Sequence, residues 1–257
     1  MTRLSIQSRQ ILPALCRMRM AVAFALCAWS CGASKPILHA TRDPSFTLAT
    51  LGQGQVAVAG VTSKLGSEID RATVRNQFAG ILASELEFNL RGLRVMPVDV
   101  ARSRLGRARH ARLLVDLEET GHVSAAAIAQ LDSTIGAEVR YVVVARIETE
   151  KVEREDGTTA GLYTPAMPEL GVSATYEEGD PQRSTRRTLD VSFLVYELSN
   201  GRAVWDERIR GTDIETVTGS WTKKKTTYPV YPKAPKLEGA FDDACRTLAK
   251  HMAIPPK

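Results

Sequence analysis

The chain has 257 residues, of which 44% are hydrophobic and 25% charged, so it can bury a substantial core and wholesale disorder is excluded. The formal net charge is +5, but the first 30 residues contain four arginines, Arg3, Arg9, Arg17 and Arg19, and no acidic residue. Without them the net charge is +1, so the basic balance gives no support for nucleic-acid binding.

The first 30 residues have the features of an export signal. After Arg19, Met20 to Ser30 is an uncharged stretch that ends in a small residue before Cys31. A basic segment followed by a short apolar run is typical of a secretory signal peptide. The run is shorter than the roughly 20 apolar residues that a membrane-spanning helix needs. We therefore predict a lipoprotein signal peptide over residues 1–30.

The four residues Ala28 to Cys31 resemble the lipobox of bacterial lipoproteins, in which a small residue precedes a lipidated cysteine. Ala28 and Trp29 depart from that pattern, which usually has leucine at the first position and no bulky residue at the second. The resemblance implies that acyl chains such as palmitate are attached at Cys31. Gly32 follows instead of aspartate, which favours the outer over the inner membrane, facing the periplasm. The alternative is an ordinary cleaved signal with an incidental cysteine.

The remaining cysteines leave no intramolecular disulfide. Cys16 and Cys27 are removed with the signal, and Cys31 is acylated, so Cys245 stays as the only free thiol. Cys245 falls on the apolar side of a predicted helix, where a small buried thiol is expected.

The first part of the mature chain predicts a tether followed by strand and helix. Residues 31–54 show little periodicity and are expected to link the anchor to the domain. Residues 55–61 alternate as a strand does, and Asp70 can cap a helix that Gly92 ends. The apolar positions of that helix form one stripe: Val74, Phe78, Ile81, Leu82, Leu86 and Leu90.

Strands and helices continue to alternate up to residue 150. The stretch 93–98 predicts a strand that Pro97 places near a sheet edge or end. An arginine-rich region follows, with one or two helices broken near Gly106, and then a helix that runs from Ser124 to Gly136. Residues 139–147 are rich in β-branched side chains and predict a central strand. This order indicates an α/β layer fold.

Two polar insertions interrupt the last third of the chain. Residues 151–186 are charged and then rich in glycine and proline, and we predict an insertion or long loop there. Residues 187–212 predict a hairpin around Asn200-Gly201. A two-residue turn would pair Tyr196 with Trp205, whereas a longer loop would shift that register. A second insertion, 213–236, contains Lys223 to Lys225, and a final helix is expected over 237–252. We predict one α/β domain over residues 55–253.

No enzymatic motif is found. The four histidines, His39, His110, His122 and His251, lack metal-ligand spacing, and the chain contains no CxxC, GxxxxGK or GxSxG sequence. The sequence therefore predicts a protein that is not an enzyme, with no metal and no cofactor.

One basic cluster is a candidate docking patch for an anionic partner. It consists of Arg102, Arg104, Arg107, Arg109, His110 and Arg112. The arginines would bind lipid head groups, cell-wall polymer or an acidic protein face. The alternative is a solvated helix face in which Leu105 and Ala108 pack inward. For Lys223 to Lys225 a solvated loop is favoured, since lysines also block unwanted strand pairing.

The order of these segments resembles the superfamily of curli-secretion-channel lipoproteins and periplasmic activators of penicillin-binding proteins. Ile135-Gly136-Ala137, the strand residues 141–144 and the turn Asn200-Gly201 stand at the corresponding places. The resemblance covers roughly residues 55 to 252. It implies a compact α/β domain in which helices cover both sides of a mixed sheet, and a function in binding and assembly.

Three functions follow from these observations. The favoured one is an outer-membrane-anchored periplasmic lipoprotein, a non-catalytic assembly module with an envelope protein as partner; a homo-oligomer is left open. The second is a subunit of an oligomeric outer-membrane secretion channel, in which residues 151–186 and 213–236 would become membrane hairpins. Their lysines and prolines disfavour it, because such strands alternate apolar and polar residues. The third is a small-ligand-binding domain, with the ligand at the carboxyl ends of the strands.

Overall fold

The computed structural model describes residues 37–65, 72–159, 161–164, 175–177, 179–222 and 225–254. All of them belong to one compact unit, Pro36–Lys257. The predicted signal peptide and Cys31 lie outside the described residues.

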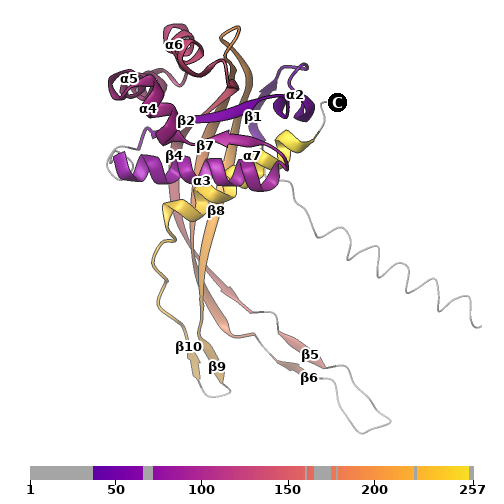
Figure 1. Ribbon diagram of the computed structural model, residues 1–257. Helices are drawn as coiled ribbons and strands as arrows, with labels where there is room; N and C mark the ends of the chain where they lie inside the picture. Colours follow the sequence, from indigo (N-terminus) through magenta and orange to yellow (C-terminus); the bar gives the residue numbers. More distant parts are fainter. Residues whose placement is uncertain are drawn as a thin grey trace, which may run out of the picture. The chain divides into compact units, whose positions relative to one another are not determined.

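The described chain forms a mixed six-stranded sheet with helices on both faces, which confirms the predicted fold class (Figure 1). The strand order is β1-β8-β7-β4-β2-β3, with β2 parallel to β3 and β4 and the other pairs antiparallel. The strands of this sheet are β1 (Ile37–Arg42), β2 (Gln55–Ser63), β3 (Arg94–Met96), β4 (Val139–Thr158), β7 (Pro181–Glu197) and β8 (Arg202–Thr218). The helices are α2 (Leu48–Leu51), α3 (Ala72–Asn89), α4 (Val98–Leu105), α5 (Arg107–Thr120), α6 (Ala125–Ile135) and α7 (Leu237–Ala253).

Two cores lie on opposite faces of the sheet because side chains alternate along each strand. In β7, Val191 and Phe193 face α3 and α7, whereas Leu194 and Tyr196 face α4, α5 and α6. All four side chains are buried. The apolar residues on both faces of this strand had predicted that it is covered on both sides, and the structure confirms it.

Helix α3 packs through the predicted stripe onto the sheet and onto α7. Phe78, Leu82, Leu86 and Leu90 are buried, and the ring of Phe78 meets that of Phe241 on α7 edge-on, with centroids 4.8 Å apart. The other two stripe positions, Val74 and Ile81, lie at its border and are partly buried.

The chain between β3 and β4 breaks where the sequence indicates. Gly106 has a φ of +86° and separates α4 from α5, so the arginine-rich stretch forms two helices. Ser124 caps α6 by accepting a hydrogen bond from the Ala127 backbone amide, and Gly136 follows the last residue of that helix. Strand β3 lies at the sheet edge, as Pro97 predicted.

The predicted tether over 31–54 is wrong for residues 37–54. Strand β1 pairs antiparallel with β8, and Phe46 and Leu51 are buried against the α3 and α7 core. A capping box in which Thr47 and Thr50 bond to each other's backbone amides begins α2. The buried apolar residues here are isolated in the sequence and show no helical or strand periodicity, so no pattern predicted them.

The predicted insertions are also not simple loops. Residues 151–158 pair with 181–188, and β8 continues to Thr218, so both segments extend strands that begin in the core. Short hairpins follow them, β5 (Leu162–Thr164) with β6 (Thr175–Glu177), and β9 (Ser220–Thr222) with β10 (Lys225–Thr227). These extensions have charged side chains on both faces, so they lack the apolar alternation by which strands are predicted.

The hairpin between β7 and β8 is confirmed, and its loop is the longer of the two alternatives. Glu197 pairs with Arg202, and Tyr196 with Ala203 instead of Trp205. The longer loop is held by Asn200, whose side-chain amide donates to Glu197 at 2.6 Å and whose carbonyl oxygen accepts from the Arg202 amide at 2.9 Å. Gly201 takes the positive φ of +67° that this loop requires.

Candidate functional site: the three-stranded arm

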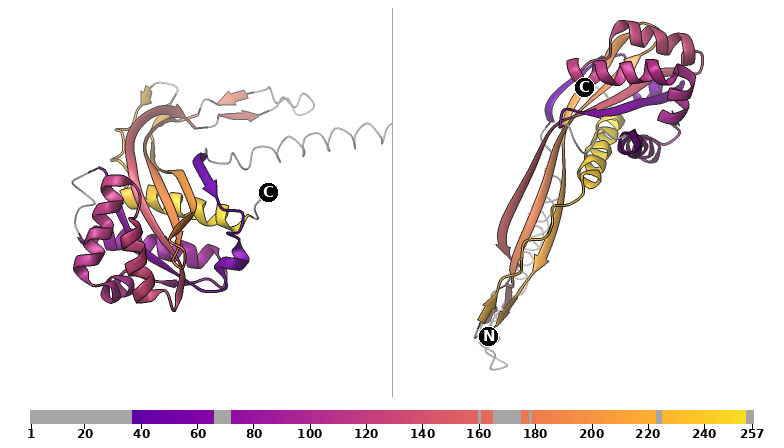
Figure 2. Two further views of the ribbon diagram at one scale, coloured as in Figure 1. Left: turned by 90° about the horizontal axis from the view of Figure 1, so that it is seen from above. Right: turned by 90° about the vertical axis from the view of Figure 1, so that its left-hand side faces the viewer.

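The three central strands continue past the helices as a narrow sheet, which we call the arm (Figures 1 and 2). It consists of residues 148–158 of β4, 181–190 of β7 and 210–218 of β8. The pairing of β2 with β4 ends at Ile147, and that of β1 with β8 ends at Ile209. Within the described ranges, both outer strands of the arm therefore present backbone groups that no further strand pairs.

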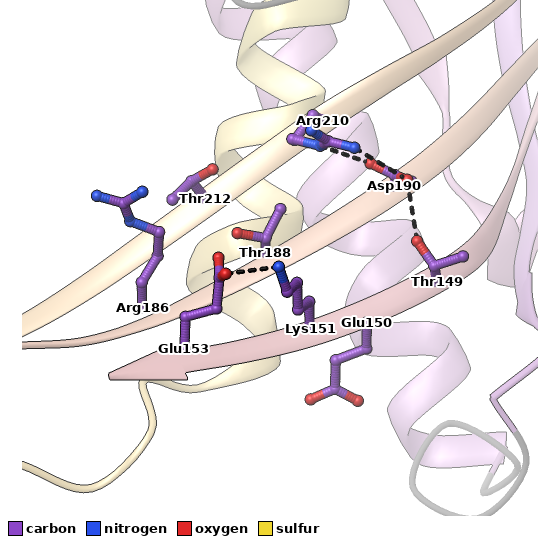
Figure 3. A pocket seen from close by; sticks show the side chains of 9 residues that line it. All are labelled: Thr149, Glu150, Lys151, Glu153, Arg186, Thr188, Asp190, Arg210 and Thr212. Atoms are coloured by element: carbon purple, nitrogen blue, oxygen red, sulfur yellow. Dashed lines mark hydrogen bonds and ion pairs between the residues drawn. The ribbon is translucent and has the colours of Figure 1, made fainter. Parts of the chain in front are cut away.

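One face of the arm is open and polar (Figure 3). Lys151, Thr188 and Thr212 lie side by side across the three strands, because each is the cross-strand partner of the next. They line a hollow of about 440 Å³, together with Thr149, Glu150, Glu153, Arg186, Asp190 and Arg210. The hollow thus contains both signs of charge.

Asp190 joins all three strands at the base of this face. Its carboxylate accepts hydrogen bonds from Thr149 at 3.0 Å and from Arg210 at 2.9 Å, and Arg208 lies 3.3 Å away. Burial alone would raise the pKa of Asp190, but the bonds from Arg210 and Thr149 outweigh it and hold that pKa below its ordinary value. The group therefore stays charged and acts as a cross-strand clamp.

The opposite face of the arm is covered by residues 225–236, which we call the strap. The strap begins with β10 and then follows the arm back to α7 (Figures 1 and 2). Arg183 donates to the Pro229 carbonyl oxygen at 2.9 Å and stacks on the Tyr231 ring, with its guanidinium carbon 4.6 Å from the centroid. Thr185 is buried and donates to the Pro232 carbonyl oxygen at 2.8 Å.

A hydrogen bond between Tyr231 and Asp156 fastens the strap to β4. The Tyr231 hydroxyl donates to the Asp156 carboxylate at 2.8 Å. This bond lowers the pKa of Asp156 and raises that of Tyr231, because it favours the charged carboxylate and the neutral phenol. The strap is thus held to the arm by side chains of two arm strands.

A second polar cluster lies at the carboxyl ends of β2 and of the parallel part of β4. Arg146 is only 5% exposed and donates to the Leu117 carbonyl oxygen at 3.0 Å and to Glu148 at 3.1 Å. Burial would raise the pKa of Glu148, but Arg146, helped by Lys64, lowers it overall.

The charges of this second cluster are paired with one another. Glu118 accepts from Thr62 at 2.9 Å and from Arg75 at 3.1 Å. The guanidinium of Arg146 also lies at the C-terminal end of α5, where a cation is favourable. These groups tie α5 and the sheet together, and nothing in their geometry favours a bound small molecule.

The predicted arginine patch is only partly assembled. Arg102 donates to the Asn76 side chain at 3.1 Å and is half-buried, and Arg104 pairs with Glu138 at 2.6 Å. Arg107, Arg109 and Arg112 are exposed on α5. The structure therefore leaves three of the five arginines on the solvent side of one helix.

His110 separates from that patch because it points into the protein. It is 6% exposed, and its Nε2 lies 2.7 Å from the Ala59 carbonyl oxygen, at a register shift in β2. Burial lowers its pKa, so the neutral ring is favoured. Leu105 is buried as expected, whereas Ala108 is exposed and does not pack inward.

Two further sequence expectations concern membranes and metals. None of the helices over the described ranges is long and apolar enough to cross a bilayer. In the same ranges no three His, Cys, Asp or Glu side chains gather as a metal site would require. Cys245 is fully buried, which raises the pKa of its thiol.

Comparisons with known proteins do not assign a family. No family model and no curated protein sequence matches the chain. Among solved structures, a PelC dodecamer from Paraburkholderia phytofirmans is 15% identical with a TM-score of 0.36, covering 84% of this chain and 95% of that one. A lipoprotein, GNA1162 from Neisseria meningitidis, is 9% identical with a TM-score of 0.29, covering 68% and 87%. These values are low, so we base the proposals on this chain's own residues.

Proposed function

We propose that the protein is an outer-membrane lipoprotein, anchored through Cys31 and facing the periplasm, that serves as a non-catalytic binding and assembly module of the cell envelope. The arm is the part that meets an envelope protein partner, and a homo-oligomer remains compatible with it. We also propose that the protein is a member of the superfamily of curli-secretion-channel lipoproteins and periplasmic activators of penicillin-binding proteins.

One observation carries the proposal: in the described ranges no further strand pairs with the outer edges of the arm, and on β8 the edge is free of α7 beyond the base, where the Thr212 amide donates to Asp243 at 2.8 Å. An exposed edge offers a row of backbone donors and acceptors to a partner strand, a common mode of protein recognition. The described polar clusters elsewhere consist of groups paired with one another, as in a scaffold.

The channel alternative is less well supported by the arm. Membrane hairpins that line a channel turn one row of apolar side chains toward lipid. The described arm instead has charged residues on both faces, such as Lys151 and Glu153 on one and Arg183 and Asp156 on the other.

The anchor is tested by the substitution Cys31→Ser. We expect the variant to leave the membrane fraction, because the acyl chains that hold the protein to lipid cannot be attached. Cell fractionation followed by mass spectrometry measures both location and acyl mass. Cys245→Ala is the matched control and should stay with the membranes. Unchanged fractionation of Cys31→Ser would refute the anchor.

The role of the arm is tested by photo-cross-linking in cells. A photoreactive residue in place of Thr216, which is exposed on β8 of the arm, should give a discrete adduct with one envelope protein. The same residue in place of Gln130, exposed on α6, should give none. An adduct from Gln130 alone would place the partner on the helical face instead.

A further inference from the structure

The chain enters the domain from the same side on which the arm leaves it. Ile37 pairs with Ile209, and Arg42 pairs with Trp205. The N-terminal end of β1 therefore lies beside the part of β8 that continues into the arm. Ile37, the first described residue, therefore lies at the base of the arm.

The connection to Cys31 is shorter than the arm. Six peptide steps separate Cys31 from Ile37, which span about 20 Å at most when fully extended. From Ile209 to Thr218 the arm continues for nine residues, about 30 Å of strand. An acyl chain at Cys31 can therefore lie no farther than about 20 Å from Ile37, a shorter span than the length of the arm.

The charges of the arm decide how it meets that surface. An arm pointing straight at the lipid would place residues such as Asp156 and Arg183 in hydrocarbon, where unsolvated charges cost several kcal/mol each. An arm lying along the membrane keeps these charges at the level of the head groups. Of these two arrangements, the charges permit the second.

The strap has the composition of a segment that binds a lipid surface. Residues 225–236 contain Lys225, Lys233 and Lys236 and no acidic residue. Val230 is 85% exposed and Tyr228 is 58% exposed, although the guanidinium carbon of Arg183 on the arm lies 5.5 Å from the centroid of the Tyr228 ring. Lysines attract anionic head groups, and tyrosine favours the interface between head groups and hydrocarbon.

We propose that the strap is a membrane-contact surface that lays the arm onto anionic phospholipid head groups. The inference rests on the anchor at Cys31 proposed above, which brings the strap to the membrane. Exposed Lys233 and Lys236 bind the phosphates, while Val230 and Tyr228 insert shallowly between the head groups.

The test uses the full acylated protein, reconstituted into vesicles of phosphatidylethanolamine and phosphatidylglycerol. Val230→Cys is labelled with an environment-sensitive fluorophore, since the thiol of Cys245 is buried and that of Cys31 is blocked by acylation. A spin label on lipid head groups should quench this fluorophore at least about twofold more than one at Gln130→Cys on α6. Vesicles of phosphatidylcholine alone should reduce the difference.

Charge reversal provides the second measurement. Lys233→Glu with Lys236→Glu, made in the labelled Val230→Cys protein, should at least halve the quenching. Arg107→Glu with Arg109→Glu changes the net charge equally on α5, where both arginines are exposed, and should leave the quenching unchanged. The far-ultraviolet circular dichroism of both variants checks that they are folded.

The outcomes separate the two proposals. Protein that does not float with the vesicles contradicts the anchor at Cys31. Protein that floats, but with equal quenching at Val230 and Gln130 or stronger quenching at Gln130, overturns the strap as the contact surface. Quenching that the α5 variant abolishes and the strap variant does not would assign lipid contact to the arginine patch.

Discussion

Replacing Phe241 by alanine is expected to lower the free energy of unfolding by about 3–5 kcal/mol, the usual cost of removing a large buried ring. Phe241 is fully buried, and its ring lies 4.8 Å from that of Phe78 on α3 and 6.3 Å from that of Phe193 on β7. The substitution leaves a cavity where two helices and the central sheet meet. Urea unfolding followed by circular dichroism measures the change.

The control for this prediction is Phe88→Ala. Phe88 lies on α3 as Phe78 does, but it is 81% exposed, so its loss should change the stability by no more than about 0.5 kcal/mol. Equal effects of the two substitutions would mean that the α3–α7 core is packed differently from the description above.

Gly211→Ala is the second substitution with a large expected effect, although it adds only one methyl group. A β-carbon at Gly211 would overlap the carbonyl oxygen of Ala240 and come within 2.9 Å of the Ala244 backbone nitrogen. Both obstacles are backbone atoms of α7, so the helix must move off the sheet. We expect a loss of about 3 kcal/mol or more, at the upper end of overpacking effects.

Gly157→Ala is the matched control because it makes the same chemical change in the arm. No atom lies within 4 Å of a β-carbon placed at Gly157. Its stability should stay within about 0.5 kcal/mol of the parent protein. A thermal melting curve of each variant compares them directly, and a stable Gly211→Ala protein would show that α7 does not approach β8 so closely.

The core of the fold is predictable from sequence wherever one segment carries its own pattern. The stripe of α3, from Phe78 to Leu90, and the cap at Ser124 are local signals, and the structure confirms both. The strand at 139–147 is recognised in the same way, by its β-branched residues.

The arm was not predictable because its stability depends on partners distant in the sequence. Residues 151–158 have no apolar alternation, and their strand is stabilised by cross-strand pairs such as Asp156 with Arg183 and Glu155 with Arg186. Taken alone, the charged sequence of either strand is typical of a solvated loop. Only the pairing with β7 shows that opposite charges meet.

The candidate site was missed for a related reason. Asp190 and Arg210 lie in segments predicted as strands, but their meeting depends on the register of β7 and β8, which the two alternatives for the turn at Asn200-Gly201 left open. The contact of Asp190 with Thr149 depends likewise on the register of β4 and β7. The signal available was a charged residue within an apolar strand, as at Asp190 and Arg146. Arg107, Arg109 and Arg112 are exposed on α5, and their role in docking stays a prediction, whereas the inward turn of His110 was not predicted.

The pairing of β1 with β8 also has a mechanical consequence. If the proposed anchor at Cys31 holds the chain to the membrane, tension on the chain enters β1 at Ile37. Backbone hydrogen bonds of an antiparallel pair run perpendicular to that axis, so the bonds from Ile37 to Arg42 are loaded together in shear instead of opening one by one. The pairing of β1 with β8 would then resist pulling, and Arg42, which donates to the Ile254 carbonyl oxygen at 2.7 Å, would pass part of the load to the end of α7.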